Sequence, residues 1–458
     1  MNHALRISAA LVTLFAGADA LSAAERTFTL EAHMTGYIGM EGDIKGKKNP
    51  TLSVDVGDTV KLVLVNAEPM AHDISLDGYQ ARSTQVLRIG DKTELTIVAK
   101  GSDNYYCSIP GHRQIGMEGR LEVKGGAAQE DASGSVASLH APMQAAAIES
   151  ARTVTVEEIG ADPTAIPAPI TRKEPAIVPV KISSSEEIAT MADGTTFEYW
   201  CYNKQVPGPL VRCRVGDTVD VTFANDAKSK LVHSIDFHAA TGPGGGAKFL
   251  QVAPGQEKEL QFKALVPGLY IYHCATPHIP SHLSHGMYGM VLVEPEAGLP
   301  KVDKEFYVMQ GDFYTTHKPG TKGHMVQDDQ RLFEEQPTFI CMNGRVGSLT
   351  GDRTMKAKVG ETVRIMFGVG GPNITSSFHV IGEIFDHVYR EGDFISPPAQ
   401  SVQTTLVPAG GVTMVDFKID TAGTYLLVDH SLSRLDKGCV GLLKAEGDEH
   451  PEIIKLVK

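Results

Sequence analysis

The chain has 458 residues, 42% of them hydrophobic and 21% charged, and this ordinary composition excludes a disordered or collagen-like protein. Its formal net charge of -13 disfavours binding to nucleic-acid phosphates or to an anionic membrane surface, and it favours a basic protein partner. At this length we expect about two to four domains rather than one hydrophobic core.

The first 24 residues have the pattern of a secretory signal peptide. Arg6 supplies a positive charge, residues 7–16 are mostly apolar, and the small residues that follow allow cleavage after Ala20 or Ala24. The alternative is a disordered cytosolic tail. Because the apolar stretch is too short to span a bilayer and no later stretch is long enough, we expect an exported, periplasmic protein that lacks residues 1–24 and has no membrane span.

An internal repeat organises the rest of the chain. The signature Val-Gly-Asp/Glu-Thr-Val begins at Val56, Val215 and Val359, and each copy opens a run of β-branched and aromatic residues that suits a strand. Downstream of each signature come a histidine, then a glycine, and six residues after the glycine a cysteine or, in the third copy, an aspartate. These residues are His72, Gly101 and Cys107; His233, Gly268 and Cys274; and His379, Gly423 and Asp429. A repeat of about 150 residues is too long for a solenoid unit, so each copy is expected to be a whole domain.

Short strands with Gly/Pro turns predict an all-β chain of three tandem β-sandwiches. We place the first repeat at residues 25–124, the second at 151–297 and the third at 298–458. Residues 125–150 are dominated by Gly, Ala, Ser and Gln, and they are predicted to form a flexible linker.

The first two repeats carry the same four ligand types in the same order: His72, Cys107, His112 and Met117 in the first, and His233, Cys274, His282 and Met287 in the second. An isolated histidine or methionine is more often a core or surface residue, but chance does not easily produce this set twice. Copper that transfers single electrons uses a trigonal His₂Cys set with a weak axial Met. The sequence therefore predicts an electron-transfer copper, of the type 1 kind, in each of these two repeats.

Strand alternation predicts a second metal site outside the second β-sandwich. Adjacent side chains on a strand point to opposite faces, and side chains two residues apart share a face. If His233 and Cys274 turn inward, then Asp236, His238 and His273 gather outside, and the peptide joining His273 to Cys274 links the two sites covalently. A three-histidine site with an open position is typical of catalysis, but this repeat offers only two outward histidines.

The third repeat has lost the cysteine. Asp429 stands at the equivalent place, and no histidine followed five residues later by methionine comes after it, so this repeat cannot hold a type 1 copper. It keeps His430 next to that position.

These sites resemble the type 1 copper sites of cupredoxins, and the second and third repeats resemble copper-containing nitrite reductase over essentially their whole length. The whole chain resembles the three-domain form of that family with an extra N-terminal cupredoxin, in the branch with a short Cys-to-His loop. The matching stretches are Leu231–His238, Tyr270–Pro277, His282–Met287, Met342–Leu349, Ser377–Ile381 and Val428–His430.

The resemblance implies three cupredoxin-like Greek-key β-sandwiches holding two type 1 coppers and one type 2 copper per chain. It implies that His430 joins His238 and His273 at the type 2 copper across a subunit interface of a homotrimer, and it leaves open a larger assembly. By the same resemblance the catalytic residues are Asp236 and His379, and the aliphatic residue above the metal is Ile381.

The implied activity is the one-electron, two-proton reduction of nitrite to nitric oxide and water, in denitrification or nitrate assimilation. The reference pKa values of aspartate and histidine, about 3.9 and about 6.5, suit proton delivery in mildly acidic to neutral medium. The implied electron donor is a c-type cytochrome or a small cupredoxin.

Two other functions remain open at this point. A multicopper oxidase also has cupredoxin repeats, but its three-copper cluster requires several His-x-His pairs and a His-Cys-His segment. None of the 17 histidines lies two residues from another, and Ala275 follows Cys274, so this function is nearly excluded. A periplasmic electron carrier or copper-binding protein explains both type 1 sites but leaves Asp236, His238 and His430 without a purpose.

The remaining cysteines are predicted to be buried free thiols, because free cysteine packs as a small hydrophobic residue: Cys201, Cys213, Cys341 and Cys439. Cys201 and Cys213 could pair if their geometry allowed it. We expect His278 and His285 to face solvent, and Trp200 to serve packing rather than electron transfer.

Overall fold

The computed structural model describes residues 24–33, 36–68, 70–109, 112–113, 117–125 and 148–457. All but the last residue of the predicted signal peptide, and nearly all of the predicted linker, lie outside the described residues. The described chain consists mainly of β-strands, which confirms the all-β class. It separates into two compact units, one built on the first repeat and the other on the second and third repeats.

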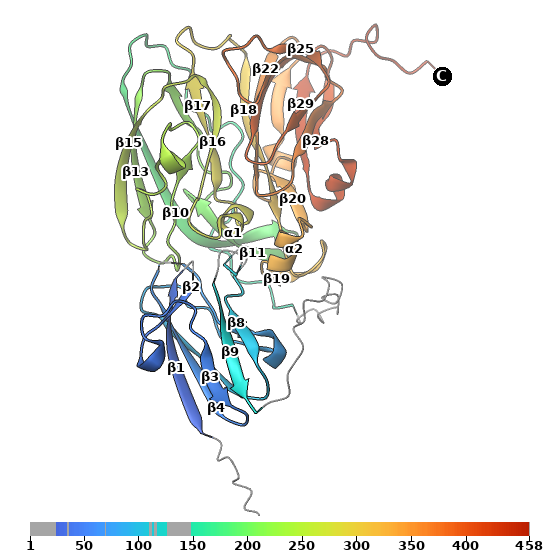
Figure 1. Ribbon diagram of the computed structural model, residues 1–458. Coiled ribbons are helices and arrows are strands. Elements are labelled where there is room, and N and C mark those ends of the chain that lie inside the picture. The colour runs from blue at the N-terminus through green and yellow to red at the C-terminus, as the bar shows by residue number, and fades with distance from the viewer. Residues whose placement is uncertain are drawn as a thin grey trace, which may run out of the picture. The chain divides into compact units, whose positions relative to one another are not determined.

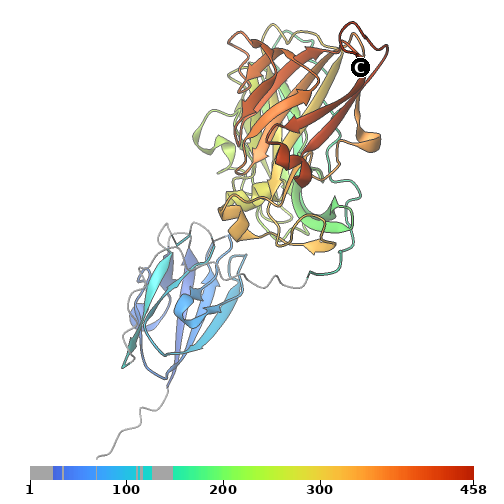
Figure 2. The ribbon, with the colours of Figure 1, turned by 90° about the vertical axis from the view of Figure 1, so that its right-hand side faces the viewer.

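The first unit is a β-sandwich of two sheets, visible in Figure 1 and from the side in Figure 2. One sheet has the order β2-β1-β4-β7 and the other the order β3-β9-β8-β5-β6. Every second residue of β4 is buried, as in a strand with one face on the core. The strands are β1 (Glu25–His33), β2 (Gly36–Gly39), β3 (Leu52–Asp55), β4 (Thr59–Asn66), β5 (Ser75–Leu76), β6 (Ala81–Arg82), β7 (Lys92–Val98), β8 (Asp103–Tyr106) and β9 (Glu118–Lys124).

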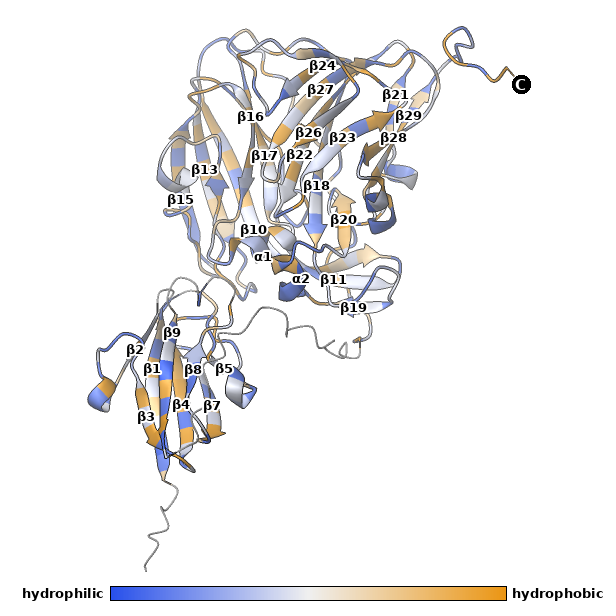
Figure 3. Ribbon diagram, turned by 45° about the vertical axis from the view of Figure 1, so that its right-hand side comes forward, coloured by the Kyte–Doolittle hydropathy of each residue, from blue (hydrophilic) through white to orange (hydrophobic). Residues whose placement is uncertain are grey.

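The second repeat forms a sandwich with sheet orders β15-β13-β10-β11-β19 and β12-β17-β16-β14. Figure 3 shows apolar and polar residues alternating along β13, which matches its burial pattern. The helix α1 (Ile279–Ser284) lies in the loop after β16. The strands are β10 (Ile177–Ala192), β11 (Thr195–Tyr202), β12 (Val211–Arg214), β13 (Thr218–Asn225), β14 (Asp236–Phe237), β15 (Glu257–Lys263), β16 (Gly268–His273) and β17 (Tyr288–Glu294).

The third repeat has sheet orders β20-β18-β22-β27-β24-β25 and β21-β29-β28-β23-β26. It also supplies β19 (Gly323–Met325), which pairs in parallel with β11 and so completes a sheet of the second repeat. Its other elements are β18 (Lys304–Phe313), α2 (Asp329–Phe333), β20 (Phe339–Met342), β21 (Met355–Lys358), β22 (Thr362–Gly371), β23 (Ser376–Ile381), β24 (Phe385–Arg390), β25 (Ala399–Val402), β26 (Thr404–Val407), β27 (Val412–Lys418), β28 (Gly423–Asp429) and β29 (Val440–Glu446).

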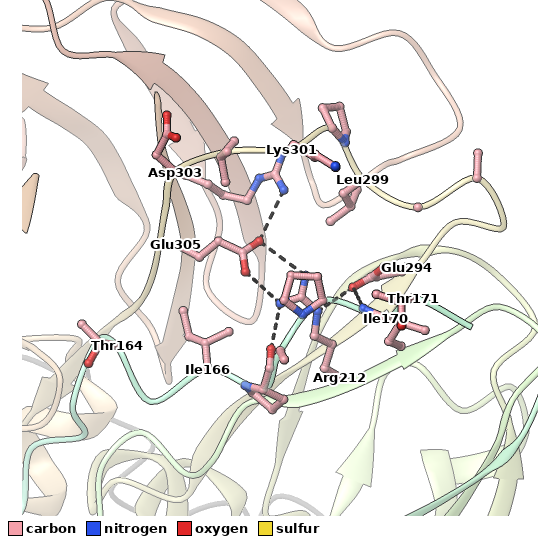
Figure 4. Close-up of a pocket in the computed structure, with 18 residues that line it drawn as sticks. Thr164, Ile166, Ile170, Thr171, Arg212, Glu294, Leu299, Lys301, Asp303 and Glu305 are labelled. Carbon is pink, nitrogen blue, oxygen red and sulfur yellow. Dashed lines mark hydrogen bonds and ion pairs between the residues drawn. The ribbon is translucent and has the colours of Figure 1, made fainter. Parts of the chain in front are cut away.

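Buried ion pairs join the second and third repeats within the second unit. Arg212 of β12 bonds through Nε to Glu294 at 2.6 Å and through Nη1 to Glu305 of β18 at 2.8 Å, and Figure 4 shows these three side chains converging. Glu305 also pairs with Arg364 of β22, which is held by two bonds to Asp416. Because an unpaired charge in this buried position would be costly, the network favours one arrangement of the two repeats.

None of the helices in the described part of the chain has both the length and the apolar character required to cross a membrane.

Candidate metal centres

The structure brings together the predicted ligands of the first repeat. The ligand atoms of His72, Cys107 and His112 all lie within 4.8 Å of one another, and these side chains and that of Met117 are buried. His72 sits in a β-bridge with Val86, Cys107 directly follows β8, and Met117 directly precedes β9. Two backbone bonds close the ligand loop, from Met117 N–H to the His112 carbonyl at 2.9 Å and from Cys107 N–H to the Met117 carbonyl at 3.2 Å.

The second repeat reproduces this arrangement. His282 Nδ1 lies 3.3 Å from both Cys274 Sγ and His233 Nδ1, and His233 forms the bridge to Val252 that corresponds to His72 and Val86. The loop closes through the same two bonds, from Met287 N–H to the His282 carbonyl and from Cys274 N–H to the Met287 carbonyl, both at 3.1 Å. All four side chains are buried.

Both sites fit copper. Metal bonds of about 2.0–2.3 Å to nitrogen and sulfur place three planar ligands about 3.5 Å apart. The two separations of 3.3 Å in the second repeat are close to that value. Among the described residues, neither ring nitrogen of His72 has a hydrogen-bond partner despite burial. His233 Nε2 lies 3.6 Å from a Glu186 carboxylate oxygen, which leaves its Nδ1 to face the metal site. Burial lowers the pKa of His72 and of His282 to about 3, so both imidazoles are neutral, as metal ligands must be.

The cysteine of the second site is also prepared for metal binding. Burial raises the pKa of the Cys274 thiol, but a hydrogen bond and charge interaction with His233 outweigh that effect and lower it below its ordinary value. Ser234 N–H donates to Cys274 Sγ at 3.4 Å. A thiolate is the form of cysteine that binds metals, so the direction of this pKa shift suits a metal ligand.

A third group of ligand atoms lies on the outside of the second repeat, as strand alternation predicted. Asp236, His238 and His273 place one ligand atom each within 4.8 Å of the others. Asp236 of β14 is the direct cross-strand partner of His273 of β16, so their side chains share a face. The Nε2 atoms of His238 and His273 are 3.1 Å apart, while Nδ1–H of His273 donates to the Cys274 carbonyl at 3.0 Å.

These contacts suit a cation held between the two imidazoles. The bond from His273 Nδ1 to a carbonyl leaves Nε2 as the ligand atom, which is the usual way that a protein orients a metal-binding histidine. Desolvation and the neighbouring His273 lower the pKa of His238 below its ordinary value, which keeps it neutral. Within a single chain, however, the ligand group found in the described residues does not include His430.

The third repeat brings His379 and His430 together at a separate place on the chain. Their ring centroids are 5.5 Å apart, and His379 Nδ1 donates to the Gln403 carbonyl at 2.5 Å. This bond places the proton of a neutral imidazole on Nδ1 and leaves Nε2 as the unprotonated ring nitrogen. His430 is exposed, and the Ile381 side chain is 42% exposed, so an apolar residue and two histidines share one open face.

The strand registers correct one feature of the sequence repeat. In each repeat one residue lies directly across the sheet from Cys107, Cys274 or Asp429. Extending the strand pairings of β5 with β8, β14 with β16 and β23 with β28 gives these cross-strand partners as Ile74, Ile235 and Phe378. The ligand histidine lies two residues before that position in the first two repeats, and the third repeat has Ser376 there. His379 is therefore not the equivalent of His72 and His233, because the loop after its signature has a different length.

The same registers show what His379 does correspond to. It lies one residue after the cysteine partner position, and so does Asp236 in the second repeat. Two residues further along, His238 corresponds to Ile381. The predicted catalytic pair therefore occupies one structural position in two successive repeats, which spacing from the signature does not reveal.

The sequence did not point to two residues that contact the predicted catalytic pair, Gly245 and Gln403. Gly245 (φ +49°) approaches Asp236 so closely that a Cβ placed on it would lie 1.8 Å from Asp236 Oδ1. The signal available was the run Gly242-Pro-Gly-Gly-Gly246, which permits an unusual backbone. Gln403 acts only through its backbone carbonyl, so nothing in its identity marked it.

The solvent-facing prediction for His285 is wrong. His285 is buried, with its ring stacked on Trp200 at 3.9 Å and on Phe197 at 5.1 Å. Trp200 also meets the ring of His282 edge-on at 4.8 Å, so it packs against the copper loop, as expected for a packing role. His278 has intermediate exposure.

The four remaining cysteines are buried free thiols, as predicted, and Cys201 and Cys213 do not pair.

Comparison with known proteins agrees with this geometry. Residues 47–124 match the family model described as copper-binding proteins of the plastocyanin/azurin family, and residues 184–298 and 314–448 match models described as multicopper oxidase. Together with the sites above, these matches define a multi-domain copper protein built from cupredoxin-like β-sandwiches.

The relatives narrow this class to one family. The copper-containing nitrite reductase of Neisseria meningitidis serogroup B is 53% identical over 290 residues, which cover 63% of this chain and 74% of that protein. That of Pseudomonas chlororaphis is 33% identical, covering 62% and 83%. A solved copper nitrite reductase from Nitrosomonas europaea is 33% identical with a TM-score of 0.53, covering 60% of this chain and 96% of that one. The chain belongs to the copper-containing nitrite reductase family.

Proposed function

We propose that this chain reduces nitrite to nitric oxide and water, consuming one electron and two protons per nitrite. The observation that carries the proposal is the His273–Cys274 peptide, which joins a buried Cys-His site to an outward pair of histidines beside a carboxylate. Each chain would hold two type 1 coppers and one type 2 copper. When bound, a type 1 copper held by His233, Cys274, His282 and Met287 would supply the electron, and a type 2 copper held by His238, His273 and His430 would offer an open coordination position for the nitrite anion.

The chain's own residues then handle the protons and the substrate. Asp236 faces the same space as His238 and His273, so its carboxyl oxygen can give a proton to a nitrite oxygen that leaves as water. His379 is held through Nδ1–H by the Gln403 carbonyl, so in its imidazolium form it can supply the second proton from Nε2–H and return to the neutral tautomer. Ile381 offers an apolar surface that restricts the room around the anion.

We propose further that the site is shared between subunits of a homotrimer. His238 and His273 belong to the second repeat, and His430 is exposed on the third. Among the described residues of one chain, His430 does not join the ligand group of the other two. A neighbouring subunit that supplied His430, His379 and Ile381 would complete a three-histidine site with both proton-carrying residues.

The proposed setting is the periplasm, after removal of a signal peptide, in denitrification or nitrate assimilation. The electron donor would be a c-type cytochrome or a small cupredoxin. The net charge of -13 favours a donor with a basic docking surface.

The activity is tested by adding nitrite and a chemical reductant to the purified, copper-loaded protein and recording nitric oxide with an electrode. Asp236→Asn keeps the shape of the side chain but removes the titratable group, so turnover should fall by about 10²–10⁴-fold while type 1 absorption stays unchanged. Nitrite turnover of Asp236→Asn equal to that of the unmodified protein at every pH would remove Asp236 from the mechanism. Fully copper-loaded protein without a type 2 paramagnetic resonance signal would instead be an electron carrier.

The shared site is tested by complementation between two inactive chains. His238→Ala and His430→Ala should each lose type 2 copper and activity. In a mixed trimer, some interfaces combine an intact His238–His273 pair from one chain with an intact His430 from the other, so co-expression should restore part of the activity. If His430 acts within its own chain, every site lacks a ligand, and trimers shown to be mixed by native mass spectrometry stay inactive.

A further inference from the structure

The third repeat keeps the shape of a type 1 ligand loop without its ligands. Asp429 stands opposite Phe378 in the register that places the cysteine in the other repeats. Arg434 follows five residues later, at the spacing of His112 from Cys107, and Cys439 follows after five more, at the place of Met117. Cys439 N–H donates to the Arg434 carbonyl at 3.0 Å.

This bond has direct counterparts in both copper loops. Met117 N–H donates to the His112 carbonyl at 2.9 Å, and Met287 N–H donates to the His282 carbonyl at 3.1 Å. Spacing, register and hydrogen bonding therefore agree that Arg434 occupies the place of the loop histidine.

A buried polar cluster fills the place of the metal. The carboxylate of Asp429, which is fully buried, forms an ion pair with Arg434. Gln310 Nε2 donates to Asp429 Oδ2 at 3.3 Å, and Cys439 Sγ donates to Gln310 Oε1 at 3.4 Å. Ser376, at the place of the upstream ligand histidine, is buried, and its hydroxyl has no hydrogen-bond partner within the part of the chain that the structure describes.

The same carboxylate fixes the backbone on both sides of His430. Asp429 Oδ1 accepts hydrogen bonds from the N–H groups of Ser377 and Ser431, each at 3.1 Å. His430 N–H donates to the Ser377 carbonyl at 2.8 Å, and Arg434 Nη1 also donates to the Thr375 carbonyl at 2.6 Å. The ion pair thus ties β28, the start of β23 and the following loop to one point next to His430.

We propose that Asp429 and Arg434 are positioning residues for His430, and that their ion pair replaces the metal crosslink that joins strand to loop in the first two repeats. In those repeats a bound metal would hold the cysteine and the loop histidine together; here two opposite charges hold the equivalent residues. The pair keeps His430 in place before the type 2 copper binds. This inference rests on the proposed role of His430 as a ligand of that copper.

The test compares Asp429→Asn with an unmodified copper-loaded trimer. Asparagine keeps an oxygen for Ser377 and Ser431 but loses the charge that holds Arg434. Type 2 copper affinity, measured by titration with a competing chelator, should fall by about 10–100-fold, as for other residues that orient metal ligands. The paramagnetic resonance signal of the remaining type 2 copper should shift, while the absorption of the type 1 copper in the second repeat stays unchanged. Lys304→Gln, which breaks a partly exposed ion pair with Glu361 at the start of β18, serves as the control and should change neither quantity.

Each outcome decides the inference. Type 2 affinity and signal equal to those of Lys304→Gln in folded Asp429→Asn protein would overturn it. If Asp429→Asn does not fold, as judged by loss of type 1 absorption, Arg434→Lys takes its place, because lysine keeps the charge but cannot reach both Asp429 and the Thr375 carbonyl in the same geometry. Unfolding of both variants would show that the pair serves stability rather than positioning and would also overturn the inference. An unmodified protein without type 2 copper would refute the proposed function itself, which is a separate result.

Discussion

Gly245 offers a sharp test of how the chain positions Asp236. Its backbone has φ +49°, and a Cβ added there would lie 1.8 Å from Asp236 Oδ1 and 2.9 Å from the Phe237 carbonyl. Real Cβ atoms essentially never come closer than 3.0 Å to such neighbours. In Gly245→Ala the Asp236 carboxylate must therefore move by about 1 Å or more, or turn away from the space that it shares with His238 and His273.

Gly245→Ala should affect two separate quantities, turnover and stability. A displacement of about 1 Å at a reacting group can reduce turnover by about 10²-fold, and complete loss of a positioned proton donor sets the upper limit at about 10⁴-fold. The alanine also pays about 1–2 kcal/mol of stability for its left-handed backbone. Gly244→Ala separates the loss of turnover from the loss of stability. Gly244 also has a left-handed backbone, with φ +69°, but a Cβ added there meets no atom of the described residues within 4 Å.

The assay is nitrite turnover of both variants, with type 1 absorption, copper content and melting temperature recorded on the same samples. Both variants should lose similar stability and keep both type 1 centres. Only Gly245→Ala should lose turnover, by about 10²-fold. Equal turnover of the two variants in copper-loaded protein would refute the argument that Gly245 makes room for Asp236.

Two further predictions concern copper content and pH. Cys107→Ala should lose one type 1 centre, so that the copper content falls from the proposed three to two per chain. The visible absorption of the type 1 centre in the second repeat should remain, and loss of all visible absorption would contradict two independent sites. Burial, with the nearby carboxylates of Asp420 and Asp386, raises the pKa of Glu383 from 4.5 to about 7. The folded chain therefore favours the protonated form of Glu383. The free energy of unfolding is highest, as far as this group is concerned, below pH 4.5, and it falls as the pH rises toward 7. After allowance for partial solvent screening, Glu383→Gln should be more stable than the unmodified protein by about 1 kcal/mol at pH 8 and nearly equal at pH 4.5, and equal denaturation curves at pH 8 would show that the Glu383 penalty is absent.

The sequence was most informative where chemistry depends on residue type and on local periodicity. The order His, Cys, His, Met predicted two inward ligand sets, and alternation along strands predicted that Asp236, His238 and His273 would gather on the opposite face. Both predictions used only residue type, order along the chain and the alternation of side chains within short strands.

Features that depend on register or on packing between distant segments were not predictable in this way. The spacing of His379 from its signature suggested equivalence with His233, but the loop that precedes β23 has a different length and shifts the register. His285 lies inside the ligand loop, between Ser284 and Gly286, yet Phe197 and Trp200 from β11 bury its ring. The addition of β19 to a sheet of the second repeat depends on a contact between residues more than 120 positions apart.

The registers also give a physical reason for expecting one copper, not two, in the first repeat. The position of Asp236 is taken there by Ser75, which stands opposite Tyr106, the residue that corresponds to His273. The position of His238 is taken by Asp77, and its carboxylate accepts a hydrogen bond from the Tyr106 hydroxyl at 2.6 Å. An outward pair of imidazoles is thus replaced by a phenol bonded to a carboxylate, and a neutral phenol is a poor ligand for copper. Under the proposed function the inward site of the first repeat would exchange electrons, whereas the described residues of this outward face offer no pair of imidazoles to hold a second copper.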